Sequence, residues 1–221
     1  MLKAVIFDMD GVIVDTEPGY KIATDELLLE NGIVTEPDYQ DPFIGASNDF
    51  MWTTIINDFN LPYTVEECVR IVDEKRALME ERDGLHMLPG VFDLIKRFKD
   101  AGMILAIASS SPMEEIHRIV DYFHIRDYFQ VFTSGTDCAE SKPHPEVFLR
   151  AAAALHTDVS ECLVIEDSKN GLLAAKAAQI KSIGFANPMF GNQDLSSATH
   201  IVRHFDEVTL ELCNELVTST L

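Results

Sequence analysis

The chain has 221 residues, 47% of them hydrophobic and 24% charged, a composition typical of a globular protein rather than of a disordered or fibrous one. Its formal net charge of −20 repels nucleic acid and anionic lipid surfaces. The first apolar run, Ala4–Phe7, is too short for a signal peptide or a membrane span. The four cysteines form no Cys-x-x-Cys pair, which argues against a zinc site and for a reducing compartment. We therefore expect a cytoplasmic, monomeric protein that binds neither nucleic acid nor membranes.

Short β-rich runs alternate with helical patterns along the chain, which is the order typical of a parallel sheet covered by helices on both faces. The predicted strands are Lys3–Asp8, Met103–Ser109, Gln130–Thr133, Cys162–Glu166 and Lys181–Phe185. Gly102 is predicted to end the helix before the second strand, and Ser111 to cap the helix after it, with Pro112 in the first turn and Glu114 completing a capping box. The sequence therefore predicts an α/β fold with a Rossmann-like parallel sheet.

About 95 residues separate the first two predicted strands, whereas a crossover helix with its loops needs only a few tens. Three helical patterns occupy this gap: Glu17–Asn31, Asp49–Asn60 and Val65–Arg82, the last of them opened by the capping box Thr64-x-x-Glu67. We expect a small α-helical domain over residues 16–82, inserted into an α/β core made of residues 1–15 and 83–221.

Polar residues follow four of the predicted strands at their carboxyl ends, where open α/β sheets bind ligands. They are Asp8-Met9-Asp10-Gly11, Ser109-Ser110-Ser111, Ser141-Lys142-Pro143 and Glu166-Asp167-Ser168. Four carboxylates and one lysine at one edge are costly to hold together unless a cation is bound, and an all-oxygen ligand set favours Mg²⁺ over zinc. Because a dication, a lysine and hydroxyls also suit a phosphoryl group, the sequence predicts a small phosphate ester as the substrate.

These four motifs, in this order and with a helical insert after the first, resemble the haloacid dehalogenase superfamily of phosphohydrolases, in its β-phosphoglucomutase-like and sugar-phosphate phosphatase subgroup. The resemblance covers nearly the whole chain. It implies that Asp8 attacks phosphorus to form an aspartyl phosphate, and that Asp10 protonates the leaving alcohol and then activates water. It also implies that the phosphoryl oxygens are held by Ser109, Ser110 and Lys142, and that magnesium is bound by Asp8, Glu166, Asp167 and the Asp10 carbonyl.

By the same resemblance the inserted helices form a cap whose side chains select the leaving group. The candidate substrate-binding residues are Glu17, Tyr20, Ser47, Asn48 and Arg76. Mutases resembling β-phosphoglucomutase carry His where this chain has Tyr20 and Arg where it has Asn48. Without that arginine, the second phosphate of a bisphosphate intermediate loses a bidentate partner. We therefore favour a sugar-phosphate phosphatase and keep a phosphosugar mutase as the alternative.

Three other readings are weaker. A dehalogenase of the same fold would lack the second acid, whereas Asp10 is present. A phospho-receiver domain has about 120 residues, no helical insert and no Asp-x-Asp-Gly after its first strand. A non-catalytic binding module is disfavoured because every motif position is filled. Among the remaining residues, we expect Phe50, Met51 and Trp52 to form part of the core of the inserted helices.

Overall fold

The computed structural model describes residues 1–43, 46–187 and 193–219, without the side chains of Glu17 and Pro18. In this part of the chain, six parallel strands form one sheet in the order β3-β2-β1-β4-β5-β6, which is the strand order of Rossmann-like sheets. The strands are β1 (Ala4–Phe7), β2 (Ile104–Ser109), β3 (Val131–Ser134), β4 (Cys162–Glu166), β5 (Lys181–Phe185) and β6 (His200–Val202). The predicted fold class is confirmed, and β6 is an additional strand that the sequence analysis missed.

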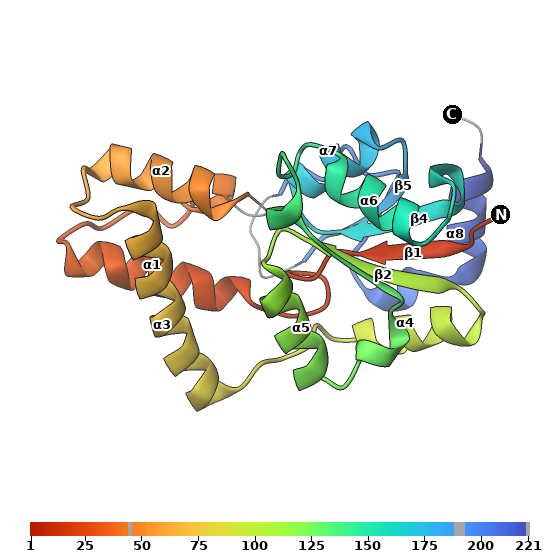
Figure 1. Cartoon of the computed structure of the whole chain (residues 1–221), viewed down its shortest axis with the longest axis horizontal. Coiled ribbons are helices and arrows are strands. Elements are labelled where there is room, and N and C mark those ends of the chain that lie inside the picture. The colour runs from red at the N-terminus through yellow and green to blue at the C-terminus, as the bar shows by residue number, and fades with distance from the viewer. Residues whose placement is uncertain (44–45, 188–192, 220–221) are drawn as a thin grey trace.

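Helices cover both faces of this sheet (Figure 1). Val5 and Phe7 of β1 point into one hydrophobic cluster, whereas Ala4 and Ile6 point into the other, as the two-residue period of a strand requires. Because both faces of the sheet are buried at β1, all four residues of this strand are apolar. The helices on the first face are α4 (Val91–Asp100), α5 (Met113–Tyr122) and α8 (Leu210–Thr218), and those on the second are α6 (Glu146–Ala154) and α7 (Lys169–Ala177).

The remaining helices lie at one end of the molecule, beyond the sheet (Figure 1). They are α1 (Glu17–Glu30), α2 (Asn48–Phe59) and α3 (Val65–Asp83). These helices enclose a hydrophobic cluster of their own around the fully buried Trp52, and Met51 packs against it. Phe50 is 58% exposed and is not part of the cluster, so the expectation that it belongs to this core is wrong; its ring contacts Phe43 at the edge of the cluster (6.2 Å between ring centres).

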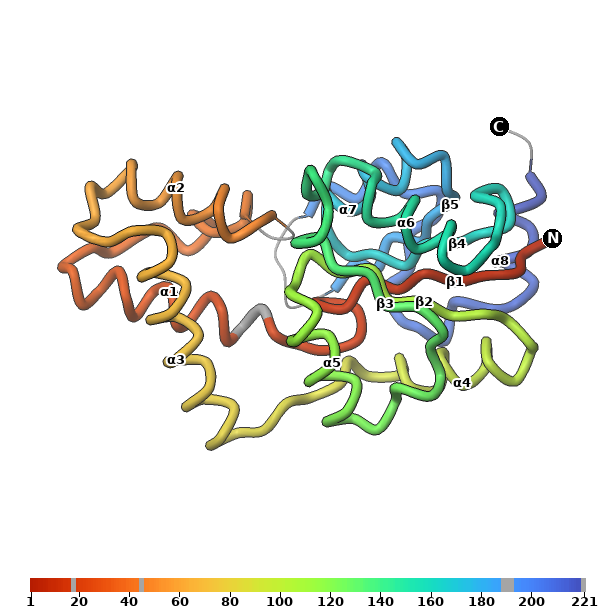
Figure 2. Tube along the Cα trace, viewed as in Figure 1, coloured from red at the N-terminus to blue at the C-terminus, as the bar shows by residue number. Residues whose placement is uncertain are grey.

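Two segments connect α1–α3 with the sheet, and they pair with each other. Asp15 N donates a hydrogen bond to His86 O (3.0 Å), Leu88 N donates one to Ile13 O (3.0 Å), and Val14 forms an antiparallel bridge with Met87. In Figure 2 the first segment leaves the end of β1, and the second returns from α3. Both connections therefore meet beside the residues that follow β1.

The register of the sheet places the polar strand ends at one edge. Phe7 of β1 lies opposite Ile107 of β2 and Ile165 of β4, so the residues that follow each strand emerge side by side. Asp8 continues the ladder, because its N–H donates to the Ile165 carbonyl (2.9 Å). Across the described residues, none of the helices combines the length and the apolar character that crossing a bilayer requires.

Candidate active site

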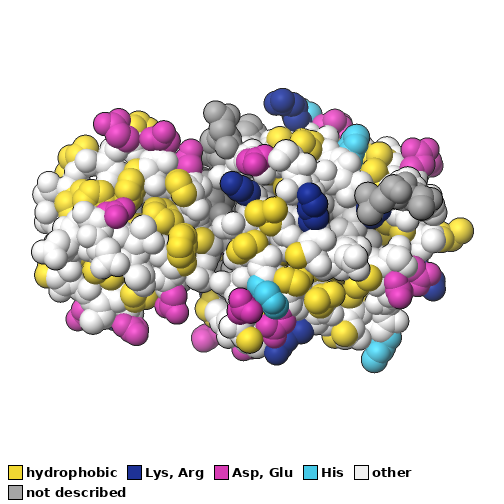
Figure 3. Space-filling model, turned by 90° about the horizontal axis from the view of Figure 1, so that it is seen from above, with side chains coloured by type: hydrophobic (Ala, Val, Ile, Leu, Met, Phe, Trp, Pro, Cys, Tyr) yellow, Lys and Arg dark blue, Asp and Glu magenta, His cyan; other side chains and the backbone are white. Residues whose placement is uncertain are grey.

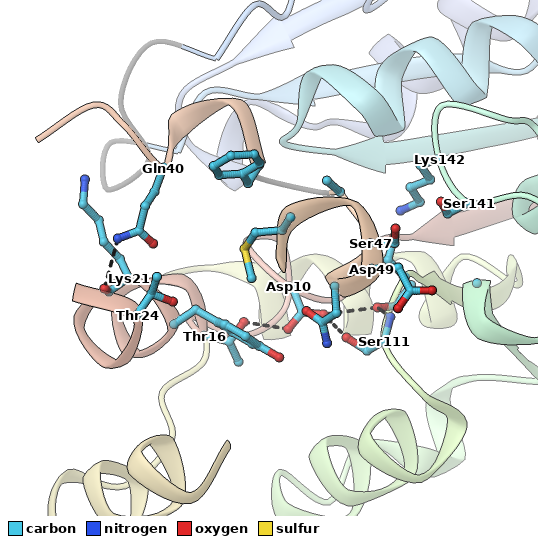
Figure 4. Close-up of a pocket in the computed structure, with 18 of the residues that line it drawn as sticks. Asp10, Thr16, Lys21, Thr24, Gln40, Ser47, Asp49, Ser111, Ser141 and Lys142 are labelled. Atoms are coloured by element: carbon cyan, nitrogen blue, oxygen red, sulfur yellow. Dashed lines mark hydrogen bonds between the residues drawn. The ribbon is translucent and has the colours of Figure 1, made fainter. Parts of the chain in front are cut away.

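A cavity of about 900 Å³ lies between the carboxyl edge of the sheet and the helices α1 and α2, and its size falls within the range of small-molecule sites. Figure 4 shows Asp10, Ser111 and Lys142 at the sheet side of this cavity. The cavity is lined by residues from all four predicted motifs, among them Asp8, Asp10, Ser109, Ser110, Lys142 and Asp167. The structure therefore brings these predicted site residues together.

Lys142 is the buried cation of this cluster, with only 5% of its surface exposed. Its Nζ donates hydrogen bonds to Asp8 Oδ1 (2.7 Å), Glu166 Oε1 (2.8 Å) and the Ala108 carbonyl (3.3 Å). The ammonium also lies 4.9 Å from the centre of the Phe148 ring. Burial opposes the charge on Lys142, but the two carboxylates outweigh it and raise its pKa. Lys142 therefore remains a cation that holds two acids in place.

The carboxylates around Asp8 bring more negative charge than the one buried lysine can neutralise. Burial raises its pKa to about 8, and the carboxylates of Glu166 and Asp10 act in the same direction, although Lys142 lowers it. Further positive charge beside Asp8 would stabilise its ionised form. Oxygen atoms of Asp8, Glu166 and Asp167, all buried, lie within 4.8 Å of one another. This donor set consists of carboxylates alone and fits a hard dication such as Mg²⁺.

Glu166 is fully buried, and both of its carboxylate oxygens accept hydrogen bonds. Oε1 accepts from Lys142, while Oε2 accepts from the N–H (2.7 Å) and the hydroxyl (2.9 Å) of Ser168, the N-cap of α7. The carboxylate lies where a side chain at Gly171 would be, since a Cβ there would come within 1.6 Å of Oε1. Gly171 was expected to open a helix and was not among the predicted site residues, although its position directly after the Glu166 motif is the signal that points to the site.

Asp10 is held by three hydroxyl groups. Its Oδ1 accepts from Thr16 (2.6 Å), and its Oδ2 accepts from Ser111 (2.7 Å) and Ser109 (3.1 Å). Ser111 was expected to cap the next helix, and this is wrong: α5 begins after Pro112 without a side-chain cap, because the Ser111 hydroxyl is directed to Asp10. Ser110 borders the cavity beside them.

The candidate substrate-binding residues of the inserted segment differ in whether they border the cavity. Tyr20, Ser47 and Asn48 border the cavity, and Ser47 also caps α2 by accepting from the Phe50 N–H (3.3 Å). Arg76 lies behind Tyr20, with its guanidinium carbon 3.9 Å from the centre of the Tyr20 ring. Burial raises the pKa of Tyr20 to about 12, so its hydroxyl is neutral at physiological pH.

Arg76 is 8% exposed and is not among the described residues that line the cavity. It forms ion pairs with Asp73 (3.3 Å) and Glu80 (3.5 Å) on its own helix and approaches Glu115 of α5 (4.0 Å). The side chain of Glu17 lies outside the described residues.

Known proteins of similar sequence and structure were identified. A family model described as haloacid dehalogenase-like hydrolase matches residues 5–185. Hexitol phosphatase B of Escherichia coli O157:H7 is 32% identical over 90% of this chain and 94% of its own. β-Phosphoglucomutase of Bacillus subtilis is 30% identical over 97% of this chain and 95% of its own. The crystal structure of β-phosphoglucomutase from Clostridium difficile superposes with a TM-score of 0.81 at 28% identity, covering 98% of this chain and 97% of that one. The resemblance inferred from the motifs is confirmed: the chain belongs to the haloacid dehalogenase-like hydrolases.

Proposed function

We propose that this hydrolase releases inorganic phosphate from a small phosphorylated metabolite, a sugar phosphate, through an aspartyl phosphate on Asp8. The observation that supports this most is the buried contact of Asp8 with Lys142 (2.7 Å), next to Asp10 at the floor of the cavity. The phosphatase named among the relatives supports the same reaction type. Residues 16–82 would then act as a cap over a core made of residues 1–15 and 83–221, with the paired connections at Val14 and Met87 as its hinge.

In the first step Asp8 Oδ2 attacks phosphorus, since Oδ1 is held by Lys142. The new bond joins Oδ2 to phosphorus, and the bond from phosphorus to the leaving oxygen breaks. Asp10 donates the proton that this oxygen needs, and the alcohol departs. In the second step Asp10 takes a proton from water, whose oxygen attacks phosphorus and restores the Asp8 carboxylate. Thr16, the residue at the start of α1, donates to Asp10 and therefore ties this group to the cap.

Lys142 positions the nucleophile more than it binds the substrate, because all three of its N–H groups already donate. Contact with a phosphoryl oxygen would replace its longest bond, the 3.3 Å bond to the Ala108 carbonyl. Ser109 and Ser110 border the same space and would donate to the other phosphoryl oxygens. Magnesium would be held by Asp8, Asp167 and the Asp10 carbonyl together with Glu166. When bound, it neutralises charge on the phosphoryl oxygens and on the acids.

A phosphosugar mutase is the second candidate, because the Bacillus subtilis relative is named β-phosphoglucomutase. Such an enzyme must hold a bisphosphate intermediate while this intermediate reorients in the site. In this chain the described residues that line the cavity include no arginine, and Asn48 and Tyr20 supply neutral groups at the cap side. These observations favour the phosphatase.

One experiment separates the two reactions. The purified protein is given Mg²⁺ with a panel of sugar phosphates, and separately β-glucose 1-phosphate with a catalytic amount of glucose 1,6-bisphosphate. We expect inorganic phosphate to appear faster than glucose 6-phosphate, and no turnover in an Asp8→Asn control. Faster formation of glucose 6-phosphate would establish the mutase instead, and no reaction in either assay would refute both proposals.

A further inference from the structure

The end of the cavity remote from Lys142 is formed by residues that none of the motifs predicted. Lys21, Thr24 and Asp25 come from α1, and Gln40 comes from the segment between α1 and α2. Figure 4 shows Lys21, Thr24 and Gln40 together at this end, opposite Lys142. We propose that these four residues, called the distal subsite below, bind uncharged hydroxyl groups of the leaving group and thereby select extended polyhydroxy monophosphates. This proposal rests on the phosphatase function proposed above.

Gln40 is a nearly buried polar group of the distal subsite, with 9% of its surface exposed. Its Nε2 donates to Asp25 Oδ1 (2.7 Å) and to the Lys21 carbonyl (3.3 Å), which fixes the orientation of the carboxamide. Its Oε1 accepts no hydrogen bond from a described residue, and Figure 4 shows this oxygen on the side of the cavity. A nearly buried carboxamide whose acceptor is left open is suited to a hydroxyl donor from a ligand.

Thr24 provides an independent observation at the same place. Its side chain is fully buried, borders the cavity, and its Oγ1 has no hydrogen-bond partner among the described residues. A threonine inside a helix normally donates to the carbonyl four residues earlier, but Thr24 forms no such bond with Tyr20. A buried hydroxyl without a partner is unfavourable for folding, and valine would fill the same volume. The hydroxyl is therefore explained by a ligand group that satisfies it.

The charges around the distal subsite exclude a second anionic group. Asp25, Asp38 and Asp41 line the same cavity. Apart from Lys142, the described residues that line it include one cation, Lys21, whose ammonium donates a hydrogen bond to the Pro37 carbonyl. Residues 16–82 as a whole carry 15 acidic and 5 basic side chains. On the face drawn in Figure 3, acidic side chains are visible over α1–α3, and Lys and Arg lie over the sheet part of the molecule. A second phosphate or a carboxylate on the leaving group would be repelled, whereas hydroxyl groups would not.

The first test removes one hydroxyl without changing volume. Kinetics of Thr24→Val are compared with those of Thr54→Val, a control on α2 whose hydroxyl donates to the Phe50 carbonyl instead. The substrates are sorbitol 6-phosphate, glycerol 3-phosphate and para-nitrophenyl phosphate. For Thr24→Val we expect KM for sorbitol 6-phosphate to rise about three- to tenfold, the size of one hydrogen bond, with kcat unchanged. The other two substrates and the control should change less than about twofold, within the range of an unaffected site.

The outcomes separate the two proposals. Equal losses of Thr24→Val on all three substrates, or no loss on sorbitol 6-phosphate, would overturn the distal subsite. A wild-type protein that releases phosphate from none of the three would overturn the phosphatase function itself. Thermal unfolding provides the folding control: Thr24→Val should be at least as stable as the wild type, because it removes a buried hydroxyl that has no partner.

The second test addresses the charges. The wild type should use fructose 6-phosphate at least about tenfold more efficiently than fructose 1,6-bisphosphate, as expected where like charges meet at a site. The double variant Asp38→Asn/Asp41→Asn lacks two of the carboxylates and should therefore show a smaller ratio between the efficiencies on the two substrates. Equal use of the two substrates by the wild type, or an unchanged ratio in the variant, would contradict the charge selection.

Discussion

Gly171 offers the sharpest test of the site, because its missing side chain makes room for the Glu166 carboxylate. A Cβ at this position would lie 1.6 Å from Oε1 and 1.9 Å from Cδ of Glu166. Gly171→Ala therefore forces the carboxylate away from Lys142 and Ser168. The matched control is Gly19→Ala on α1, where a Cβ would meet no atom within 4 Å.

The size of the effect follows from the bonds that are lost. Glu166 accepts one hydrogen bond from the Lys142 ammonium and two from Ser168, and a bond to a charged group contributes about 1.5–3 kcal/mol. Alanine in place of glycine stabilises a helix by up to about 1 kcal/mol, which offsets part of this loss. With two of these three bonds lost, we expect Gly171→Ala to lower the free energy of unfolding by about 2–5 kcal/mol and the melting temperature by about 4–20 °C. Gly19→Ala should be neutral or slightly stabilising.

Urea unfolding and phosphate release, measured for both variants in the same buffer, check this expectation. Phosphate release by Gly171→Ala should fall at least about tenfold, since Lys142 loses Glu166, the acid that holds it against Asp8. Gly19→Ala should retain wild-type activity. If Gly171→Ala is as stable and as active as Gly19→Ala, the contact of Glu166 with Lys142 does not organise the site.

Three further changes probe other contacts. Asp10→Asn should reduce phosphate release at least about 100-fold while Mg²⁺ binding, measured by calorimetry, stays close to normal, because the Asp10 carbonyl is retained; near-normal release would refute the proton-transfer role. Lys142→Met should lower the free energy of unfolding of EDTA-treated protein by about 3–5 kcal/mol in urea unfolding, since it leaves two buried carboxylates without their cation. A free-energy loss no larger than that of an exposed Lys→Met control variant would contradict this. The third change concerns Glu115 of α5. Burial raises the pKa of its carboxyl, but Arg118 and then Arg76 outweigh burial and lower this pKa below its ordinary 4.5. Its contribution is therefore fully present above pH 4.5 and lost as the pH falls through the lowered value. Glu115→Gln should cost about 0.5–1 kcal/mol near pH 7, and this cost should decrease as the pH is lowered below 4.5. A cost that does not change with pH would assign the effect to packing.

The sheet was largely predictable because its inner strands leave a local signal. The predicted Cys162–Glu166 and Lys181–Phe185 coincide with β4 and β5, whose apolar runs lie between polar and helical segments. The last strand, β6, could not be found in this way. It has three residues, two of them exposed, and it lies at the edge of the sheet, so burial imposes no apolar pattern on it.

The site was predictable where it follows from sheet topology and unpredictable where it depends on tertiary contacts. Parallel strands bring their carboxyl ends to one edge, so Asp8 and Glu166 could be placed together from the sequence. Ser111 fits a helix cap in its local sequence, yet its hydroxyl is taken by Asp10, 101 residues away in the chain. Thr24 and Gln40 belong to no motif, and only the packing of α1 against the segment before α2 reveals them.

The two ends of the cavity differ in charge, and this difference predicts how a phosphate ester would bind. At the sheet side, Lys142 supplies positive charge, and a Mg²⁺ ion held by the carboxylates of Asp8, Glu166 and Asp167 would add the rest that a phosphoryl group requires. At the other side, Asp25 and its acidic neighbours border neutral groups of Thr24 and Gln40. A chain with a net charge of −20 does not attract anions in general. The phosphoryl group is therefore expected to bind only where positive charge is concentrated, at the sheet side of the cavity. We therefore expect a monoester to bind in one direction, with phosphorus at Asp8 and its hydroxyl groups toward α1.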